Sequence, residues 1–400
     1  MSRLIDSLIH HNAAREPERL ALKYAALRQT PFNFLRGTCH LFNAAMPADK
    51  AFDKAPLAWT CGDLHLENFG SYKGDNRLVY FDLNDFDEAT LAPATWSIVR
   101  FVSSVLVAAP GLHFKHEDAL EHGSAFIDAY ADALSAGKAR WLERDTAEGL
   151  IREHLEDLRE RSRKDLLDSR TRRRGKQRSL RTDGDKALPA SDKQYAQVAA
   201  LLDNFAARQE NPEFFKVLDI ARRVSGTASL GLERYVILVR GRGAPDEHYL
   251  LDLKEAPLST LTPHLHTPEP RWGSEAERVI GVQTMMQAIP TAFLHPVELG
   301  KRSCVLRELQ PSQDRINLDR CAGKTRQFRE LLVQMGQLVA WAQLRSSGRK
   351  GAANADALIE FGTKRKWRKR IMALAEIGAG QVNADWKIYC QAYDDGAFRP

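Results

Sequence analysis

The spacing of apolar residues changes twice along the chain, and these two changes constrain the fold more than any single motif. Up to about residue 158 the apolar positions mostly follow a helical period, as in "SLIHHNAAREPERLALKYAALRQ" at 7–29. Residues 235–309 instead hold short runs of β-branched and aromatic residues, which are typical of strands. The helical period returns after residue 324. The pattern predicts an α+β fold in which a small antiparallel sheet separates two helical parts of the chain.

Individual elements follow from the same patterns. "YVILV" at 235–239 and "HYLLDLK" at 248–254 flank the turn sequence "RGRGAPDE" and predict a β-hairpin. The stretch 175–191 is polar, basic and rich in turn residues, which predicts a loop. The sequence further predicts strands at 77–81 and 303–309, a helix at 275–289, and helices at 324–344 and 356–377.

Length, composition and cysteine usage favour a globular cytoplasmic protein. The 400 residues, of which 44% are hydrophobic and 28% charged, are enough to bury a sizeable core. No run approaches the roughly 18 apolar residues that cross a membrane, since the nearest candidate, 98–112, contains Arg100 and Pro110. We see no secretory signal, and five scattered cysteines without a C-x-x-C pair argue against disulfides or a Cys-rich zinc site. We expect no membrane partner.

The net charge of +6 is distributed unevenly, with basic blocks at 159–181 and 364–370. Such blocks could contact the phosphates of a nucleic acid, a nucleotide or a membrane surface. Apart from Trp367 they lack the interleaved aromatic residues on which bases stack. We interpret them as a solvated helix face and a mobile loop, and do not expect nucleic-acid binding as a primary function.

Polar side chains crowd around the predicted strand at 77–81, in "CGDLHLENFG" at 61–70 and "FDLNDFDE" at 81–88. Asp and Asn often only cap helices or form turns. Crowded carboxylates repel one another, however, and a divalent cation is the usual relief. We therefore expect a metal or catalytic site formed by this acidic cluster, which comprises Asp63, His65, Glu67, Asn68, Asp82, Asn84, Asp85, Asp87 and Glu88.

Two metal-site patterns fit the acidic cluster poorly. A calcium loop beginning at Asp82 would need Gly at its sixth position, where Asp87 stands. "GDLHL" is similar to the opening "D-x-H" of metallophosphatases, but the further Asn-His and His motifs of a two-metal site are missing downstream. The two-metal phosphoesterase nevertheless stays open as an alternative.

Phosphoryl transfer fits the spacing better. A kinase-type site needs a catalytic Asp, an Asn five positions later that helps to hold metal, and a second metal-binding Asp. Asp63 and Asn68 have this separation, and the predicted hairpin 71–81 leads directly into Asp82. The pattern "GDLHLEN … FDLND" resembles the "GDLHxxN … IDxxD" segment of aminoglycoside phosphotransferases and related kinase-like enzymes.

This resemblance implies a role for each residue. Asp63, together with His65 in the catalytic loop, would orient or deprotonate an acceptor hydroxyl. Asn68 and Asp82 would hold Mg²⁺, with Asp85 as a supporting or additional ligand.

A nucleotide-binding segment is predicted downstream of the acidic cluster. In "RRVSGTASLGLERYVILV" at 222–239, backbone N–H groups at Gly226, Ser229 and Gly231 could contact phosphates, and Lys254 follows on the next predicted strand. The next helix begins near Glu277, our candidate partner for Lys254, with Glu275 and Gln283 as alternatives. This order is that of a kinase small lobe, but it follows the catalytic loop in the chain. We therefore expect a circularly permuted, protein-kinase-like, two-lobed fold.

Four segments correspond to this arrangement. Residues 1–158 would begin the mostly helical catalytic lobe and carry its catalytic and metal loops, and 159–212 would be a basic linker or insertion. Residues 213–312 would form the small β-rich nucleotide-binding lobe, and 313–400 the remaining helices of the catalytic lobe, in which 324–344 would lead toward the catalytic loop.

A second resemblance covers most of the chain, from about residue 30 to 345. "PFNFLRG" at 31–37, "DIARRVSGTASLG" at 219–231 and "GVQTMMQA" at 281–288, together with both acidic motifs, resemble the successive motifs of a bacterial family known as domain of unknown function number twenty-two fifty-two. That name implies no activity. The chain departs from the expected patterns at Ser97, Gln343 and Gly281, where we would expect Asp, His and Glu.

These features together predict an ATP- and Mg²⁺-dependent phosphotransferase that acts on a hydroxyl of an unknown small molecule or protein. The departures at Ser97, Gln343 and Gly281 keep a different class open: a catalytically weak, nucleotide-binding regulatory module whose basic segments hold an acidic partner.

Overall fold

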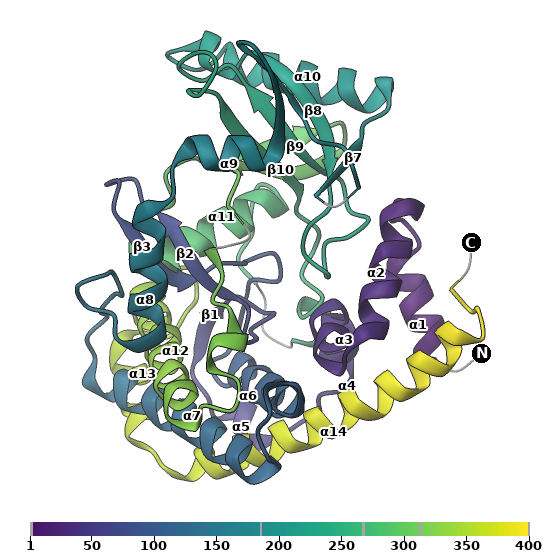
Figure 1. Cartoon of the computed structure of the whole chain (residues 1–400). Helices are drawn as coiled ribbons and strands as arrows, with labels where there is room; N and C mark the ends of the chain where they lie inside the picture. Colours follow the sequence, from purple (N-terminus) through teal and green to yellow (C-terminus); the bar gives the residue numbers. More distant parts are fainter. Residues whose placement is uncertain (1–2, 185, 266–268, 312–313, 399–400) are drawn as a thin grey trace.

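The computed structural model describes residues 3–184, 186–265, 269–311 and 314–398. Its ribbon shows a sheet-containing part at one end and a larger, mainly helical part at the other (Figure 1). The expected mixture of helices and antiparallel strands is confirmed. Helix α1 (Arg3–Asn12) packs against α14 (Lys366–Asp394) near the two ends of the chain.

A six-stranded antiparallel sheet, with strand order β11-β12-β10-β9-β8-β7, forms the first part. The predicted hairpin is confirmed as β9–β10, with Lys254 opposite Arg234. The strand predicted at 303–309 is confirmed as β12, and the helix at 275–289 as α11 (Glu275–Met286). The strands are β7 (Ala187–Pro189), β8 (Val217–Arg223), β9 (Arg234–Val239), β10 (Tyr249–Glu255), β11 (Leu294–Leu299) and β12 (Arg302–Glu308).

The prediction of a loop at 175–191 is wrong. This segment contains β7 and also β6 (Gln177–Leu180), which pairs with β5 (Thr171–Arg174) in a hairpin. Tertiary pairing overrides the polar composition here, because β7 is stabilised by ladder hydrogen bonds to β8 and Leu180 is buried. The segment 159–212, expected as a basic linker or insertion, also contains α9 (Arg163–Arg170) and α10 (Asp192–Ala206).

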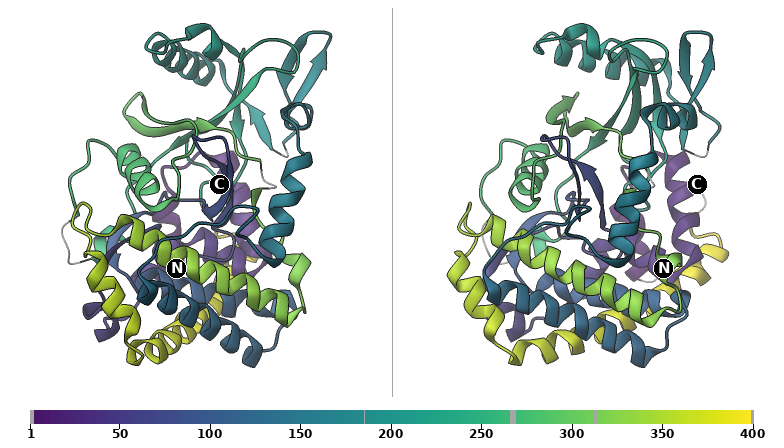
Figure 2. Two further views of the ribbon diagram at one scale, coloured as in Figure 1. Left: turned by 90° about the vertical axis from the view of Figure 1, so that its left-hand side faces the viewer. Right: turned by 60° about the vertical axis from the view of Figure 1, so that its left-hand side comes forward.

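The two faces of the sheet differ in what covers them. Successive side chains of a strand point to opposite faces, so that Tyr235, Ile237 and Val239 pack in one apolar cluster with α10. Val236 and Leu238 face the other way and pack with residues of α9, β6 and β7. Figure 2 shows the sheet-containing part above the larger helical part in two further views.

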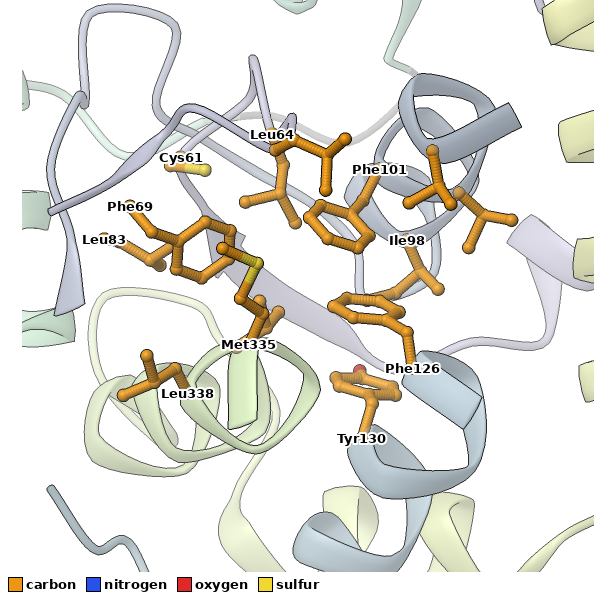
Figure 3. Packing of buried hydrophobic residues seen from close by; sticks show 14 of the residues in the cluster. Cys61, Leu64, Phe69, Leu83, Ile98, Phe101, Phe126, Tyr130, Met335 and Leu338 are labelled. Atoms are coloured by element: carbon orange, nitrogen blue, oxygen red, sulfur yellow. The ribbon is translucent and has the colours of Figure 1, made fainter. Parts of the chain in front are cut away.

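One large hydrophobic core holds the helical part together. Every residue of α6 is buried, and Phe126 and Tyr130 of α7 pack beside Met335 and Leu338 of α12 (Figure 3). The helices are α1 (Arg3–Asn12), α2 (Pro17–Gln29), α3 (Pro31–Gly37), α4 (Cys39–Ala45), α5 (Lys50–Asp53), α6 (Trp96–Ala108), α7 (His116–Ala136), α8 (Gly149–Asp157), α12 (Thr325–Ser346), α13 (Ala355–Thr363) and α14 (Lys366–Asp394).

Two helix predictions need correction. The helical pattern does not run unbroken to residue 158, because α7 ends at Ala136. The next residue, Gly137, caps the helix with a φ of +65°, a left-handed conformation that favours glycine. The helix predicted at 356–377 is two helices, since α13 ends before Lys364 and α14 begins at Lys366. The helix predicted at 324–344 is confirmed as α12.

Two short antiparallel ribbons position the acidic cluster. Strand β1 (Leu57–Thr60) pairs with β4 (Thr90–Pro93), and β2 (Phe69–Lys73) pairs with β3 (Val79–Leu83). The strand expected at 77–81 is therefore shifted by two residues. The acidic residues lie mainly in the loops β1–β2 and β3–β4. Phe69 and Leu83, the strand residues next to these loops, pack in the hydrophobic core (Figure 3).

Candidate functional site

Asn68 ties the two acidic loops together. Its side-chain amide donates to the carbonyl oxygens of Asp63 at 2.8 Å and Asp85 at 3.2 Å, and its Oδ1 accepts the backbone N–H of Asp85 at 2.8 Å. The predicted metal ligand therefore uses both ends of its amide within the protein. In this structure Asn68 fixes the loop of Asp63 beside the loop of Asp85.

Asp63, the predicted catalytic base, forms an ion pair with Arg100 of α6. Arg100 Nε donates to Asp63 Oδ1 at 2.7 Å, and Nη2 contacts the same oxygen while also donating to the carbonyl oxygen of Leu35 at 3.0 Å. Burial raises the pKa of Asp63 despite this cation. Sequence reasoning missed Arg100 as a site residue, although an arginine inside the apolar run "WSIVRFVSSVLVA" was a signal of a buried partner.

His65 lies buried in the same loop. Its Nδ1 accepts the backbone N–H of Glu67 at 3.1 Å, and its ring meets Phe32 edge-on. Burial, and after it the charge of Arg36, holds the pKa of His65 well below its usual range. The imidazole is therefore neutral at pH 7 and braces the loop beside Asp63.

Asp82, the predicted metal ligand, lies in a buried ion pair. Its Oδ2 accepts a hydrogen bond from Arg345 Nη2 of α12 at 2.7 Å, and its Oδ1 accepts the N–H of Leu83 at 2.9 Å. The residue is only 1% exposed, and burial raises its pKa. The structure thus places the Asp82 carboxylate against α12, where it joins β3 to the helical part.

Lys254 meets the acidic loop through Asp85 and Asp87. Its Nζ lies 3.4 Å from Asp85 Oδ1 and in closest contact with Asp87 Oδ2. The lysine side chain is 4% exposed, whereas those of Asp87 and Asp85 are 21% and 41% exposed. The structure therefore brings together a lysine of strand β10 and two partly accessible carboxylates from a distant part of the chain.

The two carboxylates share one ammonium group. Burial alone would raise the pKa of Asp85, but the charge of Lys254 outweighs burial and holds it below its usual range. Burial and the charge of Asp85 raise the pKa of Asp87. The charges of Arg307, Arg315 and Arg234 also act on Asp85 and lower its pKa.

The glycine-containing segment lies between β8 and β9, as expected, and the N-terminal region holds it in place. Gly226 and Gly231 have φ values of +74° and +86°, a left-handed conformation that suits glycine. Arg15 Nη1 donates to the carbonyl oxygens of Ala228 and Leu230, each at 2.7 Å. Ser229 is buried in the same segment and donates its N–H to the carbonyl oxygen of Gly226 at 3.0 Å.

Glu277 is exposed at the first turn of α11, where its Oε2 accepts the N–H of Gly273 at 3.1 Å. Glu275 pairs with Arg278 at 2.6 Å, and the Gln283 amide donates to Gln287 and Thr291. The structure places none of the three expected helix residues on Lys254, whose ion pairs in the described part of the chain are those with Asp85 and Asp87.

The remaining acidic residues also have partners inside the protein. Glu67 pairs with Arg36 at 2.8 Å, and Glu88 accepts the N–H and hydroxyl of Thr260 at 2.6 and 2.8 Å. Among the residues described, no three His, Cys, Asp or Glu side chains form a group that could hold a metal ion. The crowding that suggested a divalent cation is thus largely relieved by side-chain cations and hydrogen-bond donors.

Comparison with families of known proteins gives one match. Residues 15–392 match the family described as uncharacterized protein conserved in bacteria (DUF2252). The chain belongs to this family. No curated protein and no solved structure matches it. Within the described ranges, the chain has no helix of the length and apolarity needed to cross a membrane.

A cluster of arginines beside Lys254 is a feature that sequence reasoning missed. Arg234 binds both oxygens of the fully buried Asp252, at 3.0 and 2.9 Å, while Arg223 and Arg307 lie 2.7 and 3.2 Å from its Oδ2. Burial would raise the pKa of Asp252, but these guanidinium groups hold it well below its usual range. The signal in the sequence was Asp252 itself, a carboxylate inside the apolar strand "YLLDLKE" and two positions from Lys254.

Proposed function

We propose that this protein is an ATP- and Mg²⁺-dependent phosphotransferase that acts on a hydroxyl group of a small molecule or a protein. The observation that carries the proposal is the contact of Lys254 with Asp85 and Asp87. Lys254 and Asp85 lie 169 positions apart in the chain. In a kinase-type site a strand lysine and a metal-binding acidic loop act on the same phosphates, so their meeting here supports the proposal.

The order of elements around Lys254 supports a kinase-like small lobe. Strand β8 is followed by the glycine-containing segment, then by β9, by β10 with Lys254, by α11, and by β11 and β12. The acidic loops precede this block in the chain and α12 follows it. The proposal therefore includes a two-lobed fold whose small lobe is inserted C-terminal to the catalytic loop, that is, a circular permutation.

The residues present fit a nucleotide with a divalent cation. Mg²⁺ in nucleotide sites is usually held by one or two carboxylates together with the phosphates, and Asp85 and Asp87 are partly exposed carboxylates beside a lysine. Lys254 would bind the phosphates, and the glycine-containing segment lies beside Arg234, whose Nη1 donates to the carbonyl oxygen of Ser225 at 3.1 Å. When bound, ATP would supply the phosphoryl group.

The chain itself provides a proton acceptor. Both contacts from Arg100 end on Asp63 Oδ1, so Oδ2 is the oxygen that would accept a proton from the acceptor hydroxyl. Asn68 and His65 hold this loop in place. Asp82, which the sequence suggested as a metal ligand, has a bracing role in this proposal because Arg345 binds it.

A nucleotide-binding regulatory module with little turnover is the second candidate. The observation that favours it is that the Asn68 oxygen accepts a backbone N–H and the Asp82 carboxylate is buried with Arg345. Two expected metal ligands are thus engaged within the protein. This candidate predicts binding of ATP without transfer.

Two measurements on the full chain test the proposal: calorimetry with ATP and Mg²⁺, and release of the γ-phosphate in a single turnover. We expect wild-type protein to bind and turn over ATP, and Lys254→Met to lose both. Lys301→Met, in the exposed turn between β11 and β12 of the same sheet, is the matched control and should behave as wild type.

Binding without phosphate release would favour the regulatory module, and no binding would refute both candidates. Hydrolysis of phosphoesters without ATP would instead indicate a phosphoesterase. A separate comparison tests which aspartate would hold Mg²⁺. Asp87→Asn should weaken the Mg²⁺-dependent binding of ATP more than Asp82→Asn does. The reverse order would assign the metal to Asp82.

A further inference from the structure

Arg315 is a cation of the candidate site whose guanidinium group has no close partner in the described part of the protein. Its one ion pair is with Glu67, whose Oε2 lies 3.9 Å from Arg315 Nη1. This distance is too long for a hydrogen bond, and within the described ranges its side chain forms no other polar contact. The donors of this guanidinium are therefore available to a ligand.

The neighbouring arginines differ from Arg315 in this respect. Arg36 binds the same Glu67 carboxylate at 2.8 Å, and Arg100 binds Asp63 through its Nε at 2.7 Å. Glu67 thus faces two guanidinium groups and makes a close ion pair with one of them. Among the residues described, the charge of Arg315 is the one beside the loop of Asp63 that lacks a close anion.

Arg315 lies where the two acidic loops meet. Its backbone pairs with that of Gly70 in β2, directly after the loop β1–β2. Its charge acts on His65 in this loop and on Asp85 in the loop β3–β4, and Asn68 holds the two loops together. Arg315 therefore lies close both to the loop of the proposed base and to the loop of the proposed metal ligands.

The surroundings of Arg315 favour an anion. Burial, and after it the charge of Arg36, lowers the pKa of Arg315, so the cation is less well stabilised here than in water. An anion beside the guanidinium would relieve both effects. The Arg315 side chain is 36% exposed, so a ligand can reach it.

We propose that Arg315 is a catalytic residue that contacts the phosphoryl group during its transfer. The inference rests on the proposed phosphotransferase function. In that step the acceptor oxygen forms a bond to the γ-phosphorus, the bond from this phosphorus to the bridging oxygen breaks, and its electron pair leaves with ADP. The hydroxyl proton passes to Asp63 Oδ2. Charge is spread over the equatorial phosphoryl oxygens in the transition state, and a guanidinium fork suits two of them.

Calorimetry of the full chain with ADP, Mg²⁺ and aluminium fluoride tests this contact, because aluminium fluoride mimics the phosphoryl group in transfer. Wild-type protein should bind ADP more tightly when aluminium fluoride is present, as expected for a transition-state analogue. Arg315→Gln should keep the wild-type affinity for ADP with Mg²⁺ but lose about 10- to 100-fold of the tightening, the value of a hydrogen bond to a charged group. Release of the γ-phosphate in a single turnover should fall by about 10²–10³-fold.

Two further variants separate catalysis from a structural role. Arg326→Gln removes an arginine whose side chain is 90% exposed at the start of α12, and it should behave as wild type. Glu67→Gln removes the carboxylate nearest Arg315 and leaves the guanidinium in place, so the tightening should persist. Equal losses in Glu67→Gln and Arg315→Gln would show that Arg315 only braces the loop, and would overturn the inference.

The remaining outcomes distinguish this inference from the proposed function. Wild-type protein that binds neither ATP nor ADP would refute the proposed function, and the inference with it. Wild-type protein that binds ADP without tightening, or Arg315→Gln that keeps the tightening, would overturn the inference alone. So would an equal loss of affinity for ADP with and without aluminium fluoride in Arg315→Gln, because Arg315 would then contact the bound nucleotide and not the transferred group.

Discussion

The two faces of the six-stranded sheet are formed by the same strands but carry different kinds of side chain. Under α10 the face is apolar, with Leu251, Leu253 and Leu306 in one cluster. On the opposite face the same strands carry Asp252, Lys254 and three arginines. Buried charges are costly and seldom stabilise a fold better than apolar residues would. The comparison therefore indicates that the first face maintains the fold, whereas the function that we propose for the protein places ligand binding at the second.

The largest expected effect lies outside the sheet, at Asp63 in the loop between β1 and β2. Asp63→Asn should lower phosphate transfer by about 10²–10⁴-fold, because it removes a general base while keeping the size of the side chain. Single-turnover assays would measure the loss. Since Arg100 pairs with Asp63, we also expect some loss of stability, so the assay should be run well below the unfolding temperature. Full activity in this variant would remove Asp63 from its proposed role.

Asp252→Asn should be the most destabilising change on the charged face. The substitution leaves three guanidinium groups without their shared carboxylate, and removing one partner of a buried ion pair costs about 3–5 kcal/mol. Urea denaturation would measure the change in the free energy of unfolding. Unchanged stability would mean that the arginines find other partners, and would weaken the contrast between the two faces.

Leu253→Ala, the neighbouring residue on the apolar face, is the matched comparison. Leu253 is fully buried, so its truncation should cost about 2–5 kcal/mol in the free energy of unfolding. Because its side chain points away from Lys254, the folded variant should keep wild-type affinity for ATP in calorimetry. A loss of affinity in fully folded protein would show that the two faces are coupled.

The smallest expected effect concerns Glu88, which binds Thr260 just after the charged strand β10. Burial raises the pKa of Glu88 from its usual 4.5 to about 6. The folded state therefore holds this proton more tightly than the unfolded state, and stability should fall by about 1–2 kcal/mol as the pH rises from about 4.5 to 6. Denaturation of wild type and Glu88→Gln across this range would check the slope. An equal slope in both proteins would assign it to other groups.

Much of the fold could be predicted from sequence, and part of the site. The hairpin β9–β10, the helices α11 and α12, the glycine-containing segment and Lys254 were found because their signals are local. The strands β6 and β7 were missed because a polar composition hides strands that depend on pairing with neighbours. Crowding of carboxylates in the sequence suggested a metal, but Arg100, Arg345 and Lys254 from three other elements bind them.

The sequence by itself determined which residues alternate along each strand, and hence that Asp252 and Lys254 share one face while Leu251 and Leu253 share the other. That follows from the two-residue period of a strand, which is a local property of the backbone. Only the tertiary structure decided that Lys254 meets Asp85 and Asp87, that Asp82 turns to Arg345, and that three arginines converge on Asp252. The reason is physical: the path of the chain through space sets which distant charges meet, and neither helical nor strand periodicity carries information about that path.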